Sequence, residues 1–122
     1  MSDDRPLEGC NVLLVEDETL VSFVLEDMLR DLGAGDVWHA ADVATALALL
    51  KTQRPTIAIL DLNLGDGPAY PVAQQLAQDA IPFVFVTGYG RDGLEPVWAD
   101  RPVLQKPVLL AALAKTLGAC LA

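Results

Sequence analysis

Apolar and polar residues follow one another along the chain in blocks that predict five strands separated by helices. A strand is expected wherever several apolar residues stand in succession, because a strand covered on both faces has no regular polar position. Between these runs the apolar residues recur three or four positions apart, which is the spacing of one helix face. The predicted strands are residues 10–17, 36–40, 56–62, 82–87 and 102–105.

Four segments show the helical spacing. The first is predicted over residues 19–32 and ends before two glycines. The second is expected to begin at Asp42 as its N-cap, the third to hold Pro68 in its first turn, and the last to cover about residues 108–120. The positions expected to face the core are Val21, Val24, Leu25, Met28, Leu29 and Leu32 in the first helix, Val43, Ala46, Leu47 and Leu50 in the second, Ala69, Val72, Ala73, Leu76 and Ala77 in the third, and Leu110, Leu113, Ala114 and Leu117 in the last.

The stretch between the fourth and fifth strands departs from this pattern. Residues 88–101, GYGRDGLEPVWADR, hold three glycines, and Pro96 stands where a helix is expected. Glycine and proline both oppose helix formation, so at most one or two helical turns are predicted here. Elsewhere the alternation of strands and helices predicts an α/β fold with a parallel sheet covered on both faces. Ligands of such sheets bind outside the carboxyl ends of the strands.

Polar side chains stand at those carboxyl ends. They are Glu16 and Asp17 after the first strand, Asp61 after the third, Thr87 after the fourth and Lys106 after the fifth. Carboxylates that converge repel one another unless a cation lies between them, and their oxygen ligands favour magnesium. A lysine and a hydroxyl suit the oxygens of a phosphoryl group, which an aspartate facing the metal can accept as a nucleophile. The set therefore predicts magnesium-dependent phosphoryl transfer to an aspartate at this edge of the sheet.

Each of these residues also has an ordinary explanation when taken alone. An acidic pair after a strand is commonly a solvated turn or a helix cap, and a threonine is a common strand residue. Their joint placement favours a site instead. Gly88, which follows Thr87, then carries no side chain that could obstruct the pocket.

The remaining residues with chemical potential are expected to be structural. His39 is the one histidine, and it is predicted to end the second strand away from the pocket, with no ligand spacing around it. Trp38 and Trp98 are expected to pack against the core rather than to anchor a partner.

The order Glu-Asp at 16–17, Asp61, Thr87 and Lys-Pro at 106–107 resembles the receiver domain of two-component response regulators. The resemblance covers residues 9–122 and is carried by all of these positions together. It implies a doubly wound α/β fold of the flavodoxin-like, CheY-like kind, with five parallel strands in the order 2-1-3-4-5. Helices would lie on both faces, with a weak or disordered fourth helix.

The same resemblance implies the roles of the site residues. Asp61 would be the phosphoacceptor, and Thr87 would report its phosphorylation. Lys106 would pair with the acceptor carboxylate and then with the phosphoryl group, next to a cis bond to Pro107. The ligands of Mg2+, or of Mn2+ as the alternative cation, would be Glu16, Asp17, Asp61 and the backbone carbonyl of Asn63.

Two features depart from the usual receiver pattern. Val103 stands three residues before the lysine, where receivers usually carry an aromatic side chain that changes between buried and exposed states. The second departure is the weak helical pattern of residues 88–101. With the Phe-Val-Thr-Gly-Tyr sequence at 85–89, they resemble the FATGUY (Phe-Ala-Thr-Gly-Tyr) sub-family of receivers, which often stand alone and pair with HWE-type sensor kinases. We hypothesise that 88–101 is mobile without phosphate and becomes ordered when Thr87 engages it, with Tyr89 closing over the pocket.

Length and charge narrow the function further. The 122 residues fit one domain, predicted as a disordered tail over residues 1–8 and a receiver over 9–122. The net charge of -9 argues against a nucleic-acid or anionic-membrane surface. Cys10 and Cys120 are expected to be free thiols, and the polar, acidic N-terminus does not resemble a secretory signal. A cytoplasmic monomer or weak dimer is expected.

The expected function is that of a single-domain response regulator with no output domain after its last helix. It would receive a phosphoryl group from a sensor histidine kinase or a histidine phosphotransfer protein, and act by onward transfer or by contact with an unknown downstream protein. It would be a signalling phosphoprotein, with catalysis limited to its own phosphorylation and dephosphorylation. One alternative is an aspartate-nucleophile phosphohydrolase, although Asn63 stands where such enzymes carry their general acid. The other is a receiver fold that binds partners without being phosphorylated.

Overall fold

The computed structural model describes residues 5–88 and 93–122, and it contains a five-stranded parallel sheet. The strands lie in the order β2-β1-β3-β6-β7, and every neighbouring pair is parallel. Counted along the chain as five strands, this is the order 2-1-3-4-5, so the predicted fold class is confirmed. The strands are β1 (Val12–Val15), β2 (Val37–Ala40), β3 (Ile57–Asp61), β6 (Phe83–Thr87) and β7 (Val103–Gln105).

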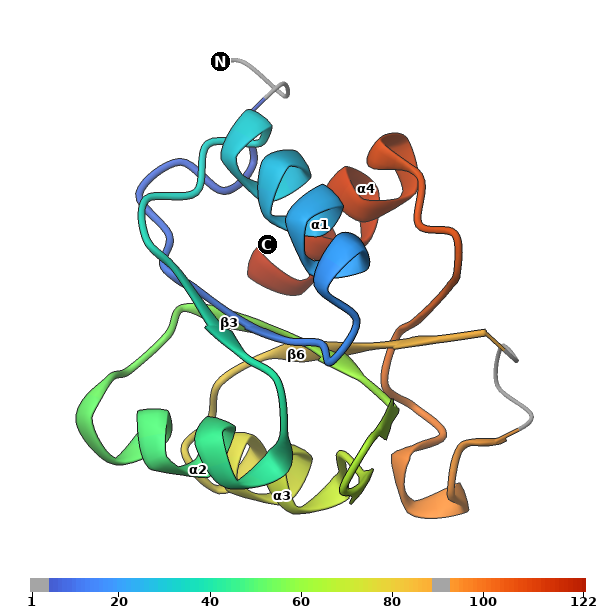
Figure 1. The fold of residues 1–122 in the computed structure, drawn as a ribbon. Coiled ribbons are helices and arrows are strands. Elements are labelled where there is room, and N and C mark those ends of the chain that lie inside the picture. The colour runs from blue at the N-terminus through green and yellow to red at the C-terminus, as the bar shows by residue number, and fades with distance from the viewer. Residues whose placement is uncertain (1–4, 89–92) are drawn as a thin grey trace.

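Two helices cover each face of this sheet. The helices α1 (Thr19–Asp31) and α4 (Leu110–Leu121) lie on one side, and α2 (Val43–Thr52) and α3 (Tyr70–Gln78) lie on the other (Figure 1). Side chains of β1 and β3 alternate between the two apolar layers, and all of them are buried. This explains why the strands read as continuous apolar runs.

Asp42 caps α2 as expected, but the start of α3 differs from the prediction. Asp42 Oδ1 accepts a hydrogen bond of 2.7 Å from the backbone N–H of Thr45. Pro68, predicted inside α3, instead belongs to a short hairpin formed by β4 (Asn63–Leu64) and β5 (Gly67–Pro68). Gly67 has φ +128°, a left-handed conformation that favours glycine and allows this turn. The helix therefore begins only at Tyr70, and Pro71 occupies its first turn.

Two predicted core positions face solvent. Val24 on α1 is 54% exposed and Leu110 on α4 is 41% exposed. The core side of α1 consists of Leu25 and Leu29, which are almost fully buried. Val24 lies instead with Leu20 and Phe23 among the exposed large apolar side chains.

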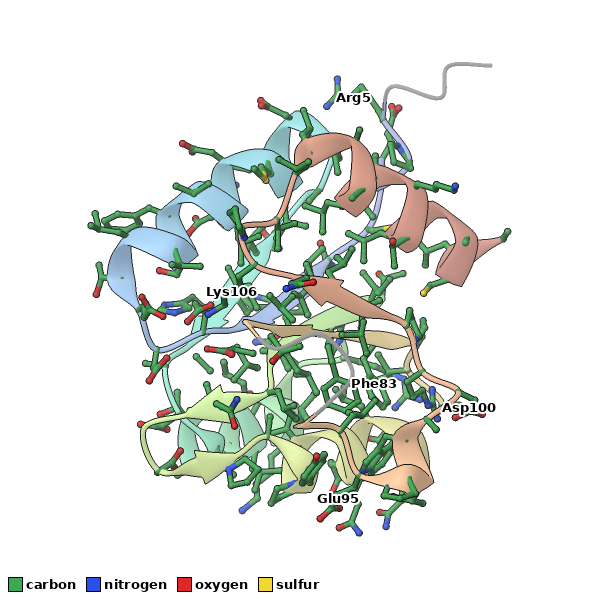
Figure 2. The ribbon with its side chains drawn as sticks, turned by 90° about the vertical axis from the view of Figure 1, so that its right-hand side faces the viewer. Arg5, Phe83, Glu95, Asp100 and Lys106 are labelled. Atoms are coloured by element: carbon green, nitrogen blue, oxygen red, sulfur yellow. The ribbon has the colours of Figure 1, made fainter. Side chains whose placement is uncertain are left out.

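The described part of the weak segment before β7 includes a short turn of 3-10 helix, η2 (Pro96–Trp98). Trp98 is 8% exposed and packs among aromatic rings, as expected for a structural tryptophan. Glu95 and Asp100 mark the two ends of this turn on the α3 side of the sheet (Figure 2). Trp98 is thus packed, although most of residues 93–101 are exposed. Tyr89 lies outside the described residues, so the mobility of 88–101 without phosphate and the closing motion of Tyr89 both stay predictions.

The N-terminal turn is part of the packed domain. Residues 1–4 lie outside the described residues, but Leu7, which we placed in a disordered tail, is fully buried. Its backbone N–H donates to the carbonyl oxygen of Leu32 at 2.9 Å. Gly33 allows this approach, because a Cβ there would lie 3.0 Å from the backbone nitrogen of Glu8. Leu7 therefore contributes to the core beside α1.

Candidate functional site

The carboxyl ends of four strands carry the predicted site residues. Asp61 is the last residue of β3 and Thr87 is the last residue of β6, while Glu16 and Lys106 directly follow β1 and β7. Figure 2 shows Lys106 at the ends of the strands, near the first turn of α1. Parallel pairing aligns these ends at one edge of the sheet, which is why residues far apart in sequence meet there.

Three carboxylates form a compact cluster at this edge. Glu16, Asp17 and Asp61 each offer an oxygen, and these atoms lie within 4.8 Å of one another. Glu16 and Asp61 are buried, with exposed fractions of 1% and 5%, whereas Asp17 is exposed. The cluster therefore has two inner acids and one acid that faces solvent.

Lys106 places its ammonium group among the acids. Its Nζ lies 3.1 Å from Glu16 Oε1, 3.3 Å from Asp61 Oδ2 and 3.6 Å from Glu18 Oε1. The contact with Asp61 is also a hydrogen bond. The contact with Glu16 is close enough for an ion pair, but Glu16 Oε1 accepts no hydrogen bond from the described residues. One cation thus faces an excess of carboxylates.

Burial and charge change the acidity of two of these groups. The pKa of Glu16 is raised, first because burial removes solvent from its carboxylate and further because Asp61 is close. The Glu18 backbone N–H and the Lys106 ammonium oppose this rise. Burial lowers the pKa of Lys106, but its pairing with Glu16 and Asp61 outweighs that effect, so the pKa of Lys106 is raised and the group stays charged.

Backbone groups hold the carboxylates in place. The backbone N–H of Asn63 donates to Asp61 Oδ1 at 3.3 Å, and that of Glu18 donates to Glu16 Oε2 at 3.1 Å. Asp61 thus has one oxygen held by the backbone and the other facing Lys106. The metal contact predicted for the carbonyl of Asn63 stays a prediction.

His39 lies closer to this site than the sequence suggested. Its Nε2 lies 2.7 Å from the backbone carbonyl oxygen of Glu16. Because a carbonyl oxygen only accepts hydrogen bonds, this nitrogen is the donor. The adjacent Ala40 carbonyl accepts the backbone N–H of Glu16 at 3.0 Å, so the end of β2 holds both peptide groups of Glu16. His39 is therefore a structural support of the site, not a residue remote from it.

Thr87 and Lys106 are joined through their backbones. The N–H of Lys106 donates to the carbonyl oxygen of Thr87 at 2.9 Å, and Thr87 is 1% exposed. The Lys106–Pro107 peptide bond is cis, as the family resemblance implied. A Cβ on Gly88 would meet no atom of the described residues within 4 Å, so the structure gives no steric reason for that glycine. Val103 is half-buried and pairs with Phe85 in the sheet.

The donor set fits a hard divalent cation. Magnesium prefers oxygen ligands and keeps several waters, and the described residues supply three carboxylate oxygens at short range with one of the acids open to solvent. The β4–β5 turn borders the same place, because a Cβ on Gly65 would lie 3.6 Å from Asp17 Oδ2. Carboxylate repulsion at this distance gives the cation a clear electrostatic role.

Sequence comparison identifies relatives along most of the chain. A family model for the response regulator receiver domain matches residues 12–116. The transcriptional regulatory protein PdtaR of Mycobacterium tuberculosis is 31% identical over 84 residues, which cover 68% of this chain and 41% of that protein. The aerobic respiration control sensor protein ArcB of Escherichia coli is 33% identical over 122 residues, which cover 91% of this chain and 15% of that protein. The chain therefore spans less than half the length of each of these curated relatives.

Solved structures share the fold over nearly the whole chain. The solution structure of SdrG from Sphingomonas melonis Fr1 has a TM-score of 0.81 and 42% identity, and the match covers 100% of both chains. The BeF3-activated conformation of SdrG from Pseudomonas melonis Fr1 has a TM-score of 0.80 and 44% identity, covering 92% of this chain and 96% of that one. The receiver domain of PhyR from Erythrobacter litoralis has a TM-score of 0.81 and 30% identity, covering 92% and 89%. In the described part of the chain, no helix combines the length and apolar character needed to cross a membrane.

Proposed function

Since this chain belongs to the response regulator receiver family, we propose that it accepts a phosphoryl group on Asp61 from a sensor histidine kinase or a histidine phosphotransfer protein. The observation that carries the proposal is the 3.3 Å contact between Lys106 Nζ and Asp61 Oδ2 beside two further carboxylates. A buried carboxylate with an ammonium group at one oxygen and a cation-binding cluster beside it is suited to receive an anionic group.

The transfer is a substitution at phosphorus. A carboxylate oxygen of Asp61 forms the new P–O bond, and the P–N bond to the donor histidine breaks. The electron pair of that bond stays on the imidazole nitrogen, so a donor ring with a proton on its other nitrogen leaves as neutral imidazole. Lys106 keeps its charge in this pocket and donates hydrogen bonds to phosphoryl oxygens as negative charge accumulates there. Thr87, at the end of the neighbouring strand, supplies a hydroxyl for another phosphoryl oxygen.

Magnesium would be held by Glu16, Asp17 and Asp61, and it would supply charge neutralisation for the incoming phosphoryl group. The protein's own contribution is to keep these acids together against their repulsion. The carboxylate of Glu16 is held by the backbone N–H of Glu18 and by the ammonium group of Lys106. Receiver domains are signalling phosphoacceptors, and we propose that catalysis by this chain is confined to its own phosphorylation and dephosphorylation.

The likeness to SdrG along the full length of both chains supports a receiver of the same kind as SdrG. We propose that its output is protein contact or onward phosphotransfer, with an HWE-type kinase as the donor. Incubation with radiolabelled candidate kinases tests the donor. The cognate kinase is expected to transfer label to the wild-type chain within the first minutes. A kinase that labels the chain only slowly is not its donor.

Incubation with acetyl phosphate and Mg2+, followed by intact-mass spectrometry, tests the phosphoacceptor itself. In this reaction the P–O bond of acetyl phosphate breaks and acetate leaves. We expect one phosphoryl adduct on the wild-type chain, none on Asp61→Asn, and an undiminished adduct on Asp27→Asn, which removes an exposed acid from the middle of α1.

Other outcomes of that experiment point to the alternatives. Repeated turnover of phosphoesters by the wild-type chain, lost in Asp61→Asn, indicates a phosphohydrolase. An unmodified wild-type chain in the presence of Mg2+ contradicts the proposal and leaves a binding module. An adduct that persists in Asp61→Asn places the acceptor on another residue.

A further inference from the structure

Glu18 is a third carboxylate partner of Lys106 and stands apart from the other two. Its Oε1 lies 3.6 Å from Lys106 Nζ, and its side chain is 65% exposed. The side chains of Glu16 and Asp61 are closer to the ammonium group and are only 1% and 6% exposed. Glu18 also lies outside the carboxylate cluster that would hold a cation. Among the described residues, Glu18 is therefore the carboxylate partner of Lys106 that can turn into solvent.

The backbone of Glu18 is fixed although its side chain is exposed. Its N–H donates to Glu16 Oε2 at 3.1 Å, at the position just before α1 begins. This hydrogen bond keeps the carboxylate within reach of Lys106 without burying it. Glu18 and Lys106 also share the border of a groove of about 440 Å³ whose other lining side chains are apolar. A fixed backbone and an exposed carboxylate are what a displaceable partner requires.

Lys106 already has as many carboxylate partners as N–H donors before any phosphoryl group arrives. An ammonium group has three N–H donors, and the described structure brings three carboxylates to within 4 Å of it. A phosphoryl group on Asp61 needs at least one of these donors. An exposed ion pair contributes little free energy, so the contact with Glu18 is the cheapest one to give up.

We propose that Glu18 is an internal competitor of the phosphoryl group: its carboxylate occupies Lys106 in the unmodified protein and is displaced when Asp61 is modified. This inference rests on the proposed phosphoacceptor function and adds a residue that sets the affinity of the pocket for phosphoryl-like anions. Glu18 weakens the binding of small anions both by holding Lys106 and by adding negative charge near the pocket.

Beryllofluoride, a phosphoryl-like anion that binds without a covalent step, is the probe. We would titrate it in the presence of Mg2+ and follow backbone amide NMR signals of the site. Glu18→Gln keeps the size of the side chain and removes its charge, so we expect beryllofluoride to bind about 2- to 5-fold more tightly than to the wild type at low salt. Glu18→Ala should show the same gain. Asp27→Asn, which removes one charge elsewhere on α1, should bind as the wild type does.

Salt separates a charge effect from a change in shape. The advantage of Glu18→Gln should shrink as the ionic strength rises, because salt screens the competing carboxylate. Equal or weaker binding by Glu18→Gln and Glu18→Ala, or a gain that salt does not reduce, would overturn the inference while leaving phosphorylation of Asp61 intact. Failure of the wild type to bind beryllofluoride, or equal binding by Asp61→Asn, would instead overturn the proposed function.

Discussion

At the scale of single residues, the close approach of the acids in the pocket lowers the stability of the folded protein. Glu16, Asp17 and Asp61 bring oxygens to within 4.8 Å of one another, and two unit charges at that distance repel by about 1 kcal/mol even in water. Lys106 offsets part of this repulsion. A cation between the acids would offset the rest of the repulsion. The stability of the folded state should therefore depend on the concentration of divalent ions.

We predict that Asp17→Asn stabilises the protein when divalent cations are removed. Loss of one exposed charge relieves repulsion without breaking any hydrogen bond that the structure shows for Asp17, and the melting temperature in EDTA should rise by a few degrees, equivalent to about 1 kcal/mol. Added Mg2+ should raise the melting temperature of the wild type and have a smaller effect on Asp17→Asn. Circular dichroism during heating measures both.

Asp27→Asn is the matched control for that experiment, because it removes the same charge from an exposed position on α1. Its melting temperature should respond to Mg2+ as the wild type's does. A lower melting temperature for Asp17→Asn in EDTA, or an undiminished response to Mg2+, would show that the three acids neither repel one another nor share a cation.

The main site residues could be predicted from sequence because the topology alone places them. Asp61, Thr87 and Lys106 stand at the ends of apolar runs, and parallel strands bring such ends to one edge. Glu18 and His39 could not be found in this way. Their contacts depend on the direction of a side chain after the strand has ended, which neither periodicity nor spacing encodes. The run Glu-Asp-Glu at 16–18 was the only available sign of a third acid.

At the scale of elements, Tyr70 connects the start of α3 to the segment that follows Thr87. Its hydroxyl accepts the backbone N–H of Glu95 at 2.9 Å and donates to the carbonyl oxygen of Gly93 at 3.2 Å. Its ring stacks on Trp98 with centroids 6.3 Å apart and planes 4° apart. Since α3 follows the hairpin that begins two residues after Asp61, this tyrosine connects the loop after Asp61 to residues 93–98.

We predict that Tyr70→Phe loosens this segment while leaving the ring packing in place. The substitution removes two hydrogen bonds, which should lower the free energy of unfolding by about 1 to 2 kcal/mol. The amide proton of Glu95 loses its acceptor and should exchange faster with solvent. Hydrogen exchange followed by NMR measures this directly.

Tyr70→Leu provides the comparison, because it removes the ring as well as the hydroxyl. It should cost more stability than Tyr70→Phe and should also change the fluorescence of Trp98, measured in a Trp38→Phe background. If the Glu95 amide in Tyr70→Phe stays as protected as in the wild type, the hydroxyl does not anchor the segment.

The same elements show where sequence reasoning stopped. Pro68 suited a first helical turn, but it pairs with Asn63 in the hairpin instead. The helix α3 begins only after that pairing has ended. Among residues 93–101, the short turn η2 and the lack of a regular helix were predictable from glycine and proline. The packing of Trp98 was not predictable, because it depends on three aromatic rings from two other elements, α3 and β6, meeting around it.

At the scale of the whole molecule, two apolar layers enclose the sheet, and the N-terminal turn completes one of them. The layer of α1 and α4 includes Leu7 together with Leu29, Leu113 and Leu117, all fully buried. The layered fold was predictable because continuous apolar runs alternate with helical spacing. The role of Leu7 was not predictable, since one leucine between Pro6 and Glu8 shows no periodicity.

We predict that Leu7→Ala destabilises the entire domain, because the side chain fills a packed layer and its removal leaves a cavity. The loss should be about 2 to 4 kcal/mol in urea unfolding. Leu20→Ala, at a position that is 79% exposed, should change stability by less than about 0.5 kcal/mol. Far-ultraviolet circular dichroism and tryptophan fluorescence should report the same shifted midpoint for Leu7→Ala if the turn belongs to the cooperative unit. A loss as small as that of Leu20→Ala would mean instead that residues before 9 form a tail that the receiver does not need, and that the contact of Leu7 with Leu32 adds nothing to folding.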